Sequence, residues 1–446
     1  MRTDPILIHS ETRMKKNLIA TAVAAAFLAA PFSAFAGETE LLARIEKMAA
    51  ELEQLKTELK ANQRKTDTIE QRQQAVAQTP AAIAVPALTL AAGPSTVISG
   101  YGEVNYNRPT KNASAAQTDV RRAVIGIQHR FDEKTKLVSE FEWEHAISSA
   151  SDQGESAVEQ LYIERQFDNG LRGKAGLFLI PAGLLNTAHE PTAYYGVERN
   201  FVETAIIPST WREVGIGLSG DFANGLAWDT GFTTGFDIFK WDAASSGDRR
   251  ESPLGSIHQE GQLAKSRNLS AHLALNWRGV PGLLVGGSVF TGNAGHKRAS
   301  FAAPDARITV YDLHTRYTPG HWDLSAVYAR GDIRNVDALN LTFVGTLNPV
   351  PVPASFAGWY AQAAYQLFKS GDYVLSPFAR YENFNTAKRY SNVTAGLGVP
   401  AATDEKVYTV GANLKVGEGV VLKADYQKFG EDKTRDRLNL GVGFSY

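Results

Sequence analysis

The side chains best suited to chemistry gather in residues 180–212, a connection without periodicity between two alternating segments. A connection this long is rare in a compact domain unless it has a function. It carries carboxylates beside two guanidinium groups, Arg199 and Arg212, which suit carboxylate or phosphate ligands. The stretch therefore predicts a site that selects charged solutes, formed by His189, Glu190, Glu198, Arg199, Glu203 and Arg212.

Patterns typical of catalytic and metal centres do not occur in the sequence. The nine histidines lack metal-ligand spacing, and no G-x-S-x-G, phosphate-cradling glycine loop or H-E-x-x-H is present. The sequence thus predicts no enzyme, no cofactor and no metal site. The alternative is a catalytic Ser–His pair formed by residues far apart in the sequence, which no sequence pattern would reveal.

The composition of the 446 residues restricts the class of protein. With no cysteine, the chain has neither disulfides nor thiolate metal sites, and its formal net charge of −1 gives no reason to expect nucleic acid as a partner. Mean hydropathy is −0.22, as in soluble proteins. A barrel that alternates lipid-facing and lumen-facing residues would have the same average.

The N-terminal segments predict export. Lys15 and Lys16 precede an apolar run that ends in Ser33-Ala34-Phe35-Ala36, so residues 1–36 are expected to be a signal peptide whose true start is Met14. Residues 37–78 follow a heptad pattern that begins at Leu41 and predicts a coiled coil. An amphipathic helix packed on its own domain is the alternative. Residues 79–95, rich in Ala and Pro, predict a linker.

Residues 96–446 consist of short alternating segments without a helical period. Tight turns, among them Asn169-Gly170 and Asn224-Gly225, alternate with longer polar connections. Since a β-sandwich has no such regular alternation, the pattern predicts an all-β transmembrane barrel of sixteen antiparallel strands. The strands are expected to start near Thr96, Thr118, Lys134, Glu155, Leu171, Glu213, Gly225, Ser266, Gly282, Ala306, His321, Ser355, Asp372, Asp404, Gly419 and Lys433.

Alternation within the strands predicts which residues face lipid and which face the lumen. In the seventh strand, Leu226, Trp228, Phe232 and Phe236 are expected to face outward. The lumen is expected to be lined by opposed charges: Arg122, Arg172, Lys174, Arg380 and Arg437 against Glu140, Glu142, Glu144 and Glu164. These charges would set a transverse field at the constriction. Alternatively, the charges of the 180–212 stretch only pin it to the wall through ion pairs.

The chain resembles the Gram-negative porins related to the phosphate-selective porins O and P. The segments that carry the resemblance are VEQLYIERQFDNGLRGKAGLFLIPAGLLNT, YGVERNFVE, IIPSTWREVGIGLSGD and RRAVIGIQ, with the terminal aromatic Tyr446. The resemblance implies an outer-membrane homotrimer whose third extracellular loop, here residues 180–212, folds into the pore. It also implies a coiled coil in the periplasm. Phosphate-selective members line their pores with arginine ladders and lysine clusters, whereas this chain adds glutamates.

Taken together, the sequence predicts passive diffusion of small hydrophilic, anionic solutes through a water-filled barrel in the outer membrane. Expected partners are two further copies of the chain, outer-membrane lipid and lipopolysaccharide, the solutes, and the cell wall through the coiled coil. The alternative function is structural: a coiled coil that tethers the barrel to the cell wall or to other partners.

Overall fold

The computed structural model describes residues 94–149, 151–242, 252–343, 350–390 and 402–446. The predicted signal peptide and coiled coil, and the linker up to residue 93, lie outside the described residues. No helix in the described ranges is long and apolar enough to cross a membrane.

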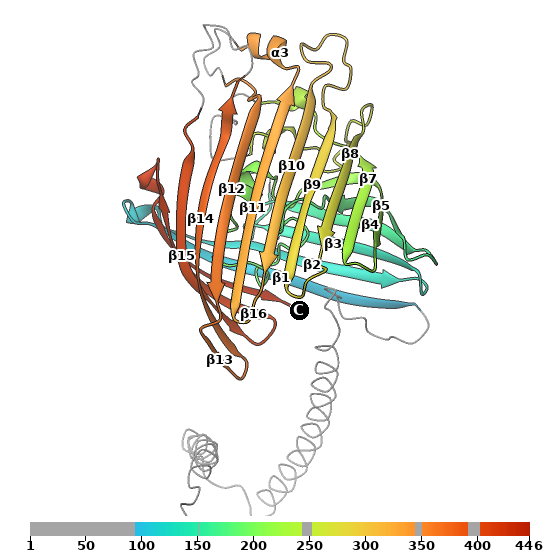
Figure 1. Ribbon diagram of the computed structural model, residues 1–446. Helices are drawn as coiled ribbons and strands as arrows, with labels where there is room; N and C mark the ends of the chain where they lie inside the picture. Colours follow the sequence, from blue (N-terminus) through green and yellow to red (C-terminus); the bar gives the residue numbers. More distant parts are fainter. Residues whose placement is uncertain (1–93, 150, 243–251, 344–349, 391–401) are drawn as a thin grey trace, which may run out of the picture. The chain divides into compact units, whose positions relative to one another are not determined.

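Antiparallel strands form one sheet that closes on itself (Figure 1). The first strand, β1, pairs with the last, β17, from Tyr101 opposite Ser445 to Pro109 opposite Arg437. The short β13 continues the line of β12 along their shared neighbour β14, so the barrel has sixteen strands, as predicted. The strands are β1 (Ser95–Pro109), β2 (Gln117–Arg130), β3 (Thr135–Glu144), β4 (Ser156–Gln166), β5 (Arg172–Leu179), β6 (Arg212–Asp221), β7 (Leu226–Thr233), β8 (Ser270–Trp277), β9 (Leu283–Asn293), β10 (Arg307–Tyr317), β11 (Trp322–Arg334), β12 (Ser355–Tyr365), β13 (Phe368–Ser370), β14 (Tyr373–Arg389), β15 (Glu405–Val416), β16 (Val420–Phe429) and β17 (Arg437–Ser445).

Two predicted strand starts are wrong by several residues. The eighth strand begins at Ser270 rather than near Ser266, and the last begins at Arg437 rather than near Lys433. In the second case a 3-10 turn, η6 (Lys433–Arg435), replaces the strand because the Asp432 side chain accepts a hydrogen bond from the backbone N–H of Thr434. Such capping stabilises a turn against extension.

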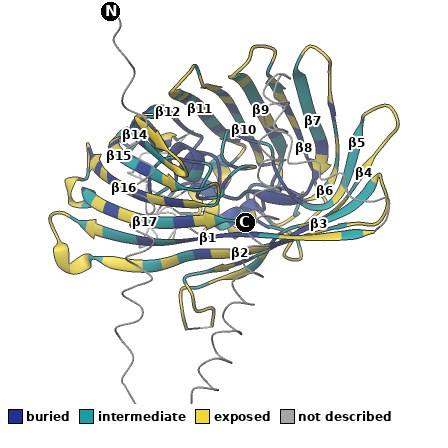
Figure 2. Ribbon diagram, turned by 90° about the horizontal axis from the view of Figure 1, so that it is seen from below, coloured by how far each residue is buried: buried dark blue, intermediate teal, exposed yellow. Residues whose placement is uncertain are grey.

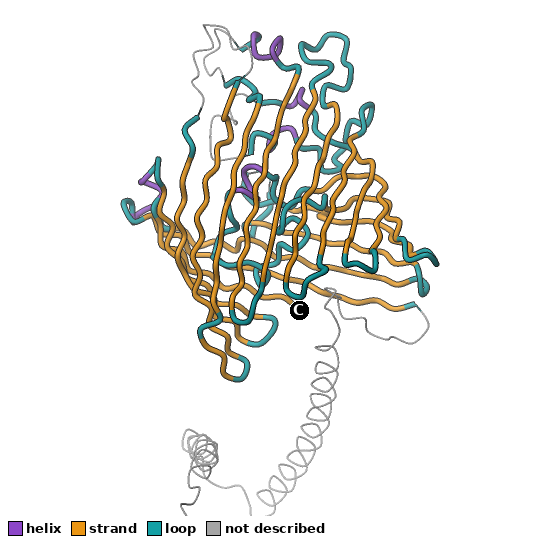
Figure 3. The backbone as a smooth tube through the Cα atoms, in the orientation of Figure 1, coloured by secondary structure: helices purple, strands orange, loops and turns teal. Residues whose placement is uncertain are grey.

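Within the described residues, helical turns lie only in the connections between strands, as Figure 3 shows. They are η1 (Ala113–Ala115), the π-helical turn η2 (Val202–Ile206), η3 (Ile238–Lys240), η5 (Gly255–Ile257), α3 (Asp337–Leu341) and η6. Hairpin turns occur where the sequence has Asn-Gly: Gly170 and Gly225 adopt φ of 81° and 84°, which glycine reaches without a steric cost. The longer connections lie at the opposite end of the barrel, here called the loop end.

The strands carry apolar side chains outside and polar or tightly packed ones inside, and Figure 2 shows buried and exposed residues alternating along many of the strands. On β17, Leu438, Leu440 and Phe444 are exposed while Asn439 is fully buried. The same outer face includes Val120, Ile125, Ile163, Ile216, Phe232, Leu273, Leu275, Leu313, Trp359, Val410 and Leu422. The continuous apolar exterior is the one that a lipid environment requires.

The prediction that Phe236 faces outward is wrong. The strand β7 ends at Thr233, so alternation no longer sets the direction of Phe236, which is 2% exposed. Its ring lies 5.4 Å from Trp211 and 5.8 Å from Phe290. These three rings belong to an apolar core inside the barrel, between the walls and the connections of the loop end.

Candidate functional site: a loop folded into the barrel lumen

The connection from β5 to β6, residues 180–211, runs inside the barrel and is here called the lumen loop. Its base is closed by Asn186, whose amide donates to the carbonyls of Ile180 (2.7 Å) and Trp211 (2.9 Å). The side-chain oxygen of Asn186 also accepts from the Trp211 backbone N–H at 2.7 Å. This one buried side chain therefore joins the two ends of the loop.

At the centre of the lumen loop, the carboxylate of Glu203 accepts four hydrogen bonds. The backbone N–H groups of Leu184 (2.5 Å) and Leu185 (2.7 Å) bind one oxygen, and Asn200 (2.8 Å) and the Tyr360 hydroxyl (3.0 Å) bind the other. Burial raises the pKa of Glu203, and these donors oppose that rise. Tyr360 belongs to β12, so the carboxylate holds the loop together and ties it to the wall.

Gly183 lies directly against this carboxylate. It adopts a φ of 65°, and a Cβ there would lie 2.4 Å from Glu203 Oε1. Only glycine therefore combines the backbone conformation with the close approach.

The apolar side of the lumen loop fills part of the barrel. The turn η2 packs against β11, β12 and β14, and Phe201 stacks on Phe384 of β14 with ring centres 5.1 Å apart. Val202, Ile206 and Ile207 are at most 1% exposed. The loop end of the lumen is thus narrowed on this side by packed apolar side chains.

The polar side of the lumen loop binds the arc of wall from β14 round to β1. The Tyr194 hydroxyl donates to Glu103 of β1 at 2.7 Å, and the Val197 N–H donates to Asp425 of β16 at 2.6 Å. Glu198 accepts from Asn107 of β1 at 2.9 Å.

On β14, two charged residues of the wall hold the loop backbone. The Arg380 guanidinium binds Glu382 at 2.8 Å and donates to the Tyr195 carbonyl at 3.1 Å. Glu382 in turn accepts from the Phe201 N–H at 2.6 Å. The predicted lining residue Arg380 therefore contacts the loop directly.

Arg199 of the lumen loop and Arg212, the first residue of β6, are both buried. Arg199 is 8% exposed and donates to the hydroxyls of Ser209 (2.8 Å) and Thr210 (3.0 Å) and to the His189 carbonyl (3.0 Å). Arg212 is 6% exposed and bonds the Thr210 carbonyl and Glu260, each at 3.3 Å. This geometry favours the alternative in which the loop charges pin the loop in place.

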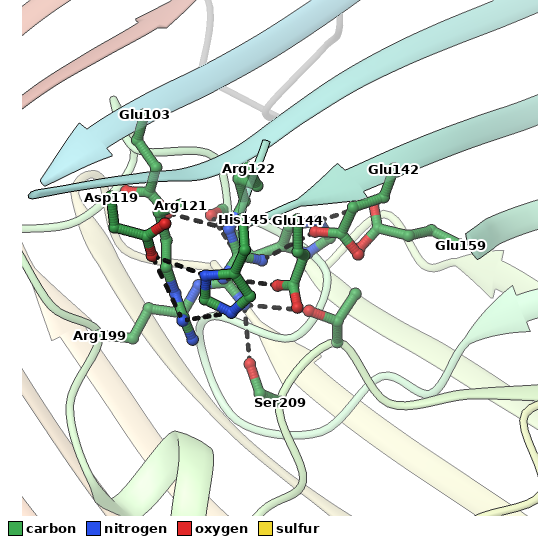
Figure 4. Close-up of polar contacts among 12 residues, drawn as sticks. Glu103, Asp119, Arg121, Arg122, Glu142, Glu144, His145, Glu159, Arg199 and Ser209 are labelled. Carbon is green, nitrogen blue, oxygen red and sulfur yellow. Dashed lines mark hydrogen bonds and ion pairs between the residues drawn. The ribbon is translucent and has the colours of Figure 1, made fainter. Parts of the chain in front are cut away.

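A carboxylate-rich wall faces the other side of the lumen loop (Figure 4). Arg122 of β2 binds Glu103 at 2.9 Å and, on β3, Glu142 at 3.1 Å and Glu144 at 3.5 Å. Beside them, Glu140 of β3 accepts from Gln160 at 2.5 Å. One arginine is thus shared by three carboxylates, and the wall has an excess of negative charge.

Near the end of the barrel that carries the hairpin turns, opposite the loop end, the lining charges form cross-strand pairs. Lys174 binds Asp229 at 2.8 Å, and Lys136 binds Glu164 at 3.0 Å. Of the remaining predicted lining residues, Arg172 binds Asp221 at 2.7 Å and Arg437 donates to Gln427 at 2.7 Å. Glu190, the last residue of the predicted loop site, is half-buried, and its side chain forms no hydrogen bond or ion pair within the described residues.

Sequence reasoning missed four cations on the inner face: Lys136 of β3, Arg316 of β10, Lys415 of β15 and the buried Lys423 of β16. Arg316 binds Asp323 of β11 at 2.6 Å and its side chain is 45% exposed. Arg316 lies two residues after the buried His314 and so shares its inner face, whereas Leu313 points outward. Lys415 lies two residues after the buried Asn413 and faces inward for the same reason. Alternation along these strands was the signal that could have found these residues.

The carboxylate-rich wall and the cations Arg316, Arg380 and Lys415 lie on different arcs of the barrel, although Arg316 and Arg380 are themselves paired with Asp323 and Glu382. The carboxylate-rich wall belongs to β1–β4, whereas Arg316, Arg380 and Lys415 belong to β10, β14 and β15. In the ring order of strands, β3 lies opposite β11, so the two groups face each other across the lumen. The arrangement can order a charged or dipolar solute between them.

Comparison with known proteins agrees with this architecture. No family model matches the chain. An uncharacterized protein of Aquifex aeolicus (strain VF5) is 29% identical over 340 residues, which cover 74% of each chain. OmpF of Salmonella typhi, solved in complex with daunomycin, superposes with a TM-score of 0.55 at 14% identity, over 79% of this chain and 98% of OmpF.

A further solved structure, the outer membrane channel DcaP of Acinetobacter baumannii, gives a TM-score of 0.49 at 10% identity, over 79% of this chain and 98% of DcaP. The structure itself shows the sixteen strands, their antiparallel order and the pairing of β1 with β17, so these features do not depend on the TM-scores. The chain therefore has the fold of the outer-membrane porin barrel that OmpF represents.

Proposed function

We propose that the protein is an outer-membrane porin through which small hydrophilic anions diffuse passively. The observation that carries the proposal is a closed barrel with an apolar exterior, charged inner walls and a loop fastened across its lumen. An apolar exterior fits lipid, and charges in a narrow passage of low dielectric select ions. The protein is proposed to act without catalysis and as a homotrimer.

The preference for anions is supported by which charges are accessible. In the Arg316–Asp323 pair the side chains are 45% and 14% exposed, and in the Lys136–Glu164 pair they are 39% and 21% exposed. In both pairs the cation is the more accessible partner, although Lys174–Asp229 (14% and 23%) and Arg172–Asp221 (35% and 58%) have the reverse order. On the β1–β4 wall, Arg122 is paired with Glu103, Glu142 and Glu144, which offsets part of their negative charge.

The proposal is tested by the reversal potential of the reconstituted protein under a salt gradient. We expect anion selectivity, and a shift towards cations in an Arg316→Ala, Lys415→Ala double variant. The matched control is Arg165→Ala, which removes a cation from the side of β4 opposite to Glu164. Cation selectivity of the unmodified protein would contradict the proposed solute class, and an unchanged potential in the double variant would contradict the role of the two residues.

The predicted role of Arg199 and Arg212 as solute-facing cations is tested by the same measurement. A reversal potential that does not move in an Arg199→Ala, Arg212→Ala double variant would leave these residues only the task of holding the loop.

Uptake of neutral sugars of increasing size into proteoliposomes gives the second test. Because the lumen loop and the apolar core narrow the barrel, we expect a sharp size limit. A protein that is folded and inserted but admits no solute would contradict diffusion and would favour a structural role in the envelope.

A further inference from the structure

Three potential metal ligands meet where the lumen loop touches the wall of the barrel. Glu140 comes from β3, Glu159 from β4 and His189 from the lumen loop, and one ligand atom from each lies within 4.8 Å of the other two. Glu159 is 0% and His189 is 4% exposed, whereas Glu140 is half-buried. The group is therefore enclosed by protein and open on the side of Glu140.

The hydrogen bonds of His189 leave one ring nitrogen directed at this group. Its Nδ1 lies 3.0 Å from the carbonyl oxygen of Asn186, which can only accept, so Nδ1 carries the proton. Its Nε2 faces Glu159 Oε2 at 3.8 Å, too far for a hydrogen bond. Metal-bound histidines have this arrangement, with the other N–H donated to a backbone carbonyl.

Glu159 supplies an independent sign of a missing partner. Its Oε2 accepts from the Tyr101 hydroxyl at 3.2 Å, but its buried Oε1 has no hydrogen-bond partner in the described structure. Strand pairing shifts between Glu140 and Phe141, opposite Gln160 and Val158, so Glu159 is the extra residue of a β-bulge. Bulges redirect a side chain, here towards the loop.

The nearby arginine does not neutralise these carboxylates. Arg122 forms its ion pairs with Glu103, Glu142 and Glu144. Within the described residues, neither Glu140 nor Glu159 forms an ion pair with a lysine or arginine. Two carboxylates and one imidazole at a buried site thus carry negative charge without a direct ion pair to a described lysine or arginine, and a bound cation would compensate it.

We propose that Glu140, Glu159 and His189 bind a divalent transition-metal ion of the Zn²⁺ class. Imidazole with carboxylates suits Zn²⁺ and its neighbours, whereas Ca²⁺ and Mg²⁺ prefer oxygen ligands alone. Tetrahedral coordination at about 2.0–2.2 Å separates ligand atoms by roughly 3.4 Å. The three side chains reach that spacing by small rotations, with water completing the coordination.

The site goes beyond passive diffusion because it would fasten the lumen loop to β3 and β4 by coordination. The opposite side of the loop is already fastened by Tyr194, Val197 and Phe201. The bound ion would then fix the width of the passage between the loop and the carboxylate-rich wall.

The test is a Zn²⁺ titration of the full chain, purified in detergent without a histidine tag and stripped with a chelator. Calorimetry and the metal content after dialysis are expected to give saturable binding of one ion per chain, with a higher unfolding temperature. In His189→Gln and Glu159→Gln we expect the affinity to fall at least tenfold. The control is His145→Gln, which disrupts a histidine–carboxylate contact of 2.8 Å with Asp119 outside the group and should leave binding unchanged.

The heat-dependent electrophoretic mobility of folded barrels shows whether each variant has folded, and Glu140→Gln provides a milder variant if His189→Gln or Glu159→Gln does not fold. Absence of saturable binding in the unmodified protein, or equal binding in the folded variants, would overturn the proposal. Because binding is measured without conductance, this result does not depend on whether the pore conducts.

Discussion

At the scale of single residues, the lumen loop depends on side chains that bond to its backbone rather than on contacts between charges. Glu203 shows this most clearly, because its two oxygens accept four donors from the loop and from β12. A carboxylate can accept all four, but no neutral side chain of the same size can.

Replacement Glu203→Gln should therefore destabilise the protein, although it removes a buried charge. The NH₂ of the glutamine amide would face two of the four hydrogen-bond donors, which would then lack an acceptor. Each buried unpaired group lowers the free energy of unfolding by about 1–3 kcal/mol. We expect a lower free energy of unfolding and a noisier current as the loop loosens. The exposed Glu418→Gln is the control, and equal stability of the two variants would count against the bonding scheme.

Glu198 should give the loop a dependence on pH. Burial alone would raise the pKa of Glu198. The charges of Arg437 and Arg121 and the hydrogen bond from Asn107 lower it by more than burial raises it, so the pKa lies below its usual value of 4.5. Since the ionised form is favoured in the folded state, its stabilisation is complete above pH 4.5 and is lost as pH falls through the lowered pKa.

The measurement is the difference in unfolding free energy between the unmodified protein and Glu198→Gln from pH 7 to pH 3. We expect a constant difference above about pH 5 and a shrinking one below pH 4.5. A difference that grows on acidification would show that the sign is wrong.

At the scale of elements, the sequence predicted strands far better than it predicted partners. Alternation located the strands because lipid and lumen impose a period of two, and it failed at Phe236 because the strand had already ended. The pairs themselves join distant positions: Lys174 and Asp229 are 55 residues apart. For the same reason, the sequence did not show that Glu140, Glu159 and His189 meet.

The lumen loop was located from the sequence as an unusually long connection, but the roles of its charges could not be read there. A guanidinium that faces a solute and one that bonds to loop hydroxyls have the same sequence signature. Burial decides between them, and Arg199 is 8% exposed. Its burial follows from the fold of residues 199–210, which no local pattern specifies.

The apolar core should contribute more to stability than the aromatic residues on the outside of the barrel. Trp211 is 1% exposed and lies 4.5 Å from the Phe290 ring, so Trp211→Ala leaves a cavity that should cost about 3–5 kcal/mol. Trp359→Ala, at a side chain 42% exposed on the outer face, should cost clearly less in detergent. Thermal unfolding compares the two, and equal losses would contradict a core inside the lumen.

At the scale of the whole molecule, the described strands close the barrel among themselves, because β1 pairs with β17. We therefore expect a variant lacking residues 38–77 to insert and to conduct like the full chain. Single-channel recordings of both proteins test this. Loss of conductance on deletion would show that the predicted coiled coil is needed for the pore, and loss of envelope attachment alone would assign it a tethering role.

Planar-bilayer recording of the purified full chain in symmetric salt shows whether the barrel is a narrow open pore. We expect stepwise conductance, in groups of three if the protein is a trimer. The Glu203→Gln variant should conduct more noisily through the same barrel. A protein that inserts fully folded but gives no current would contradict this expectation, because the lumen loop and the apolar core would then close the barrel.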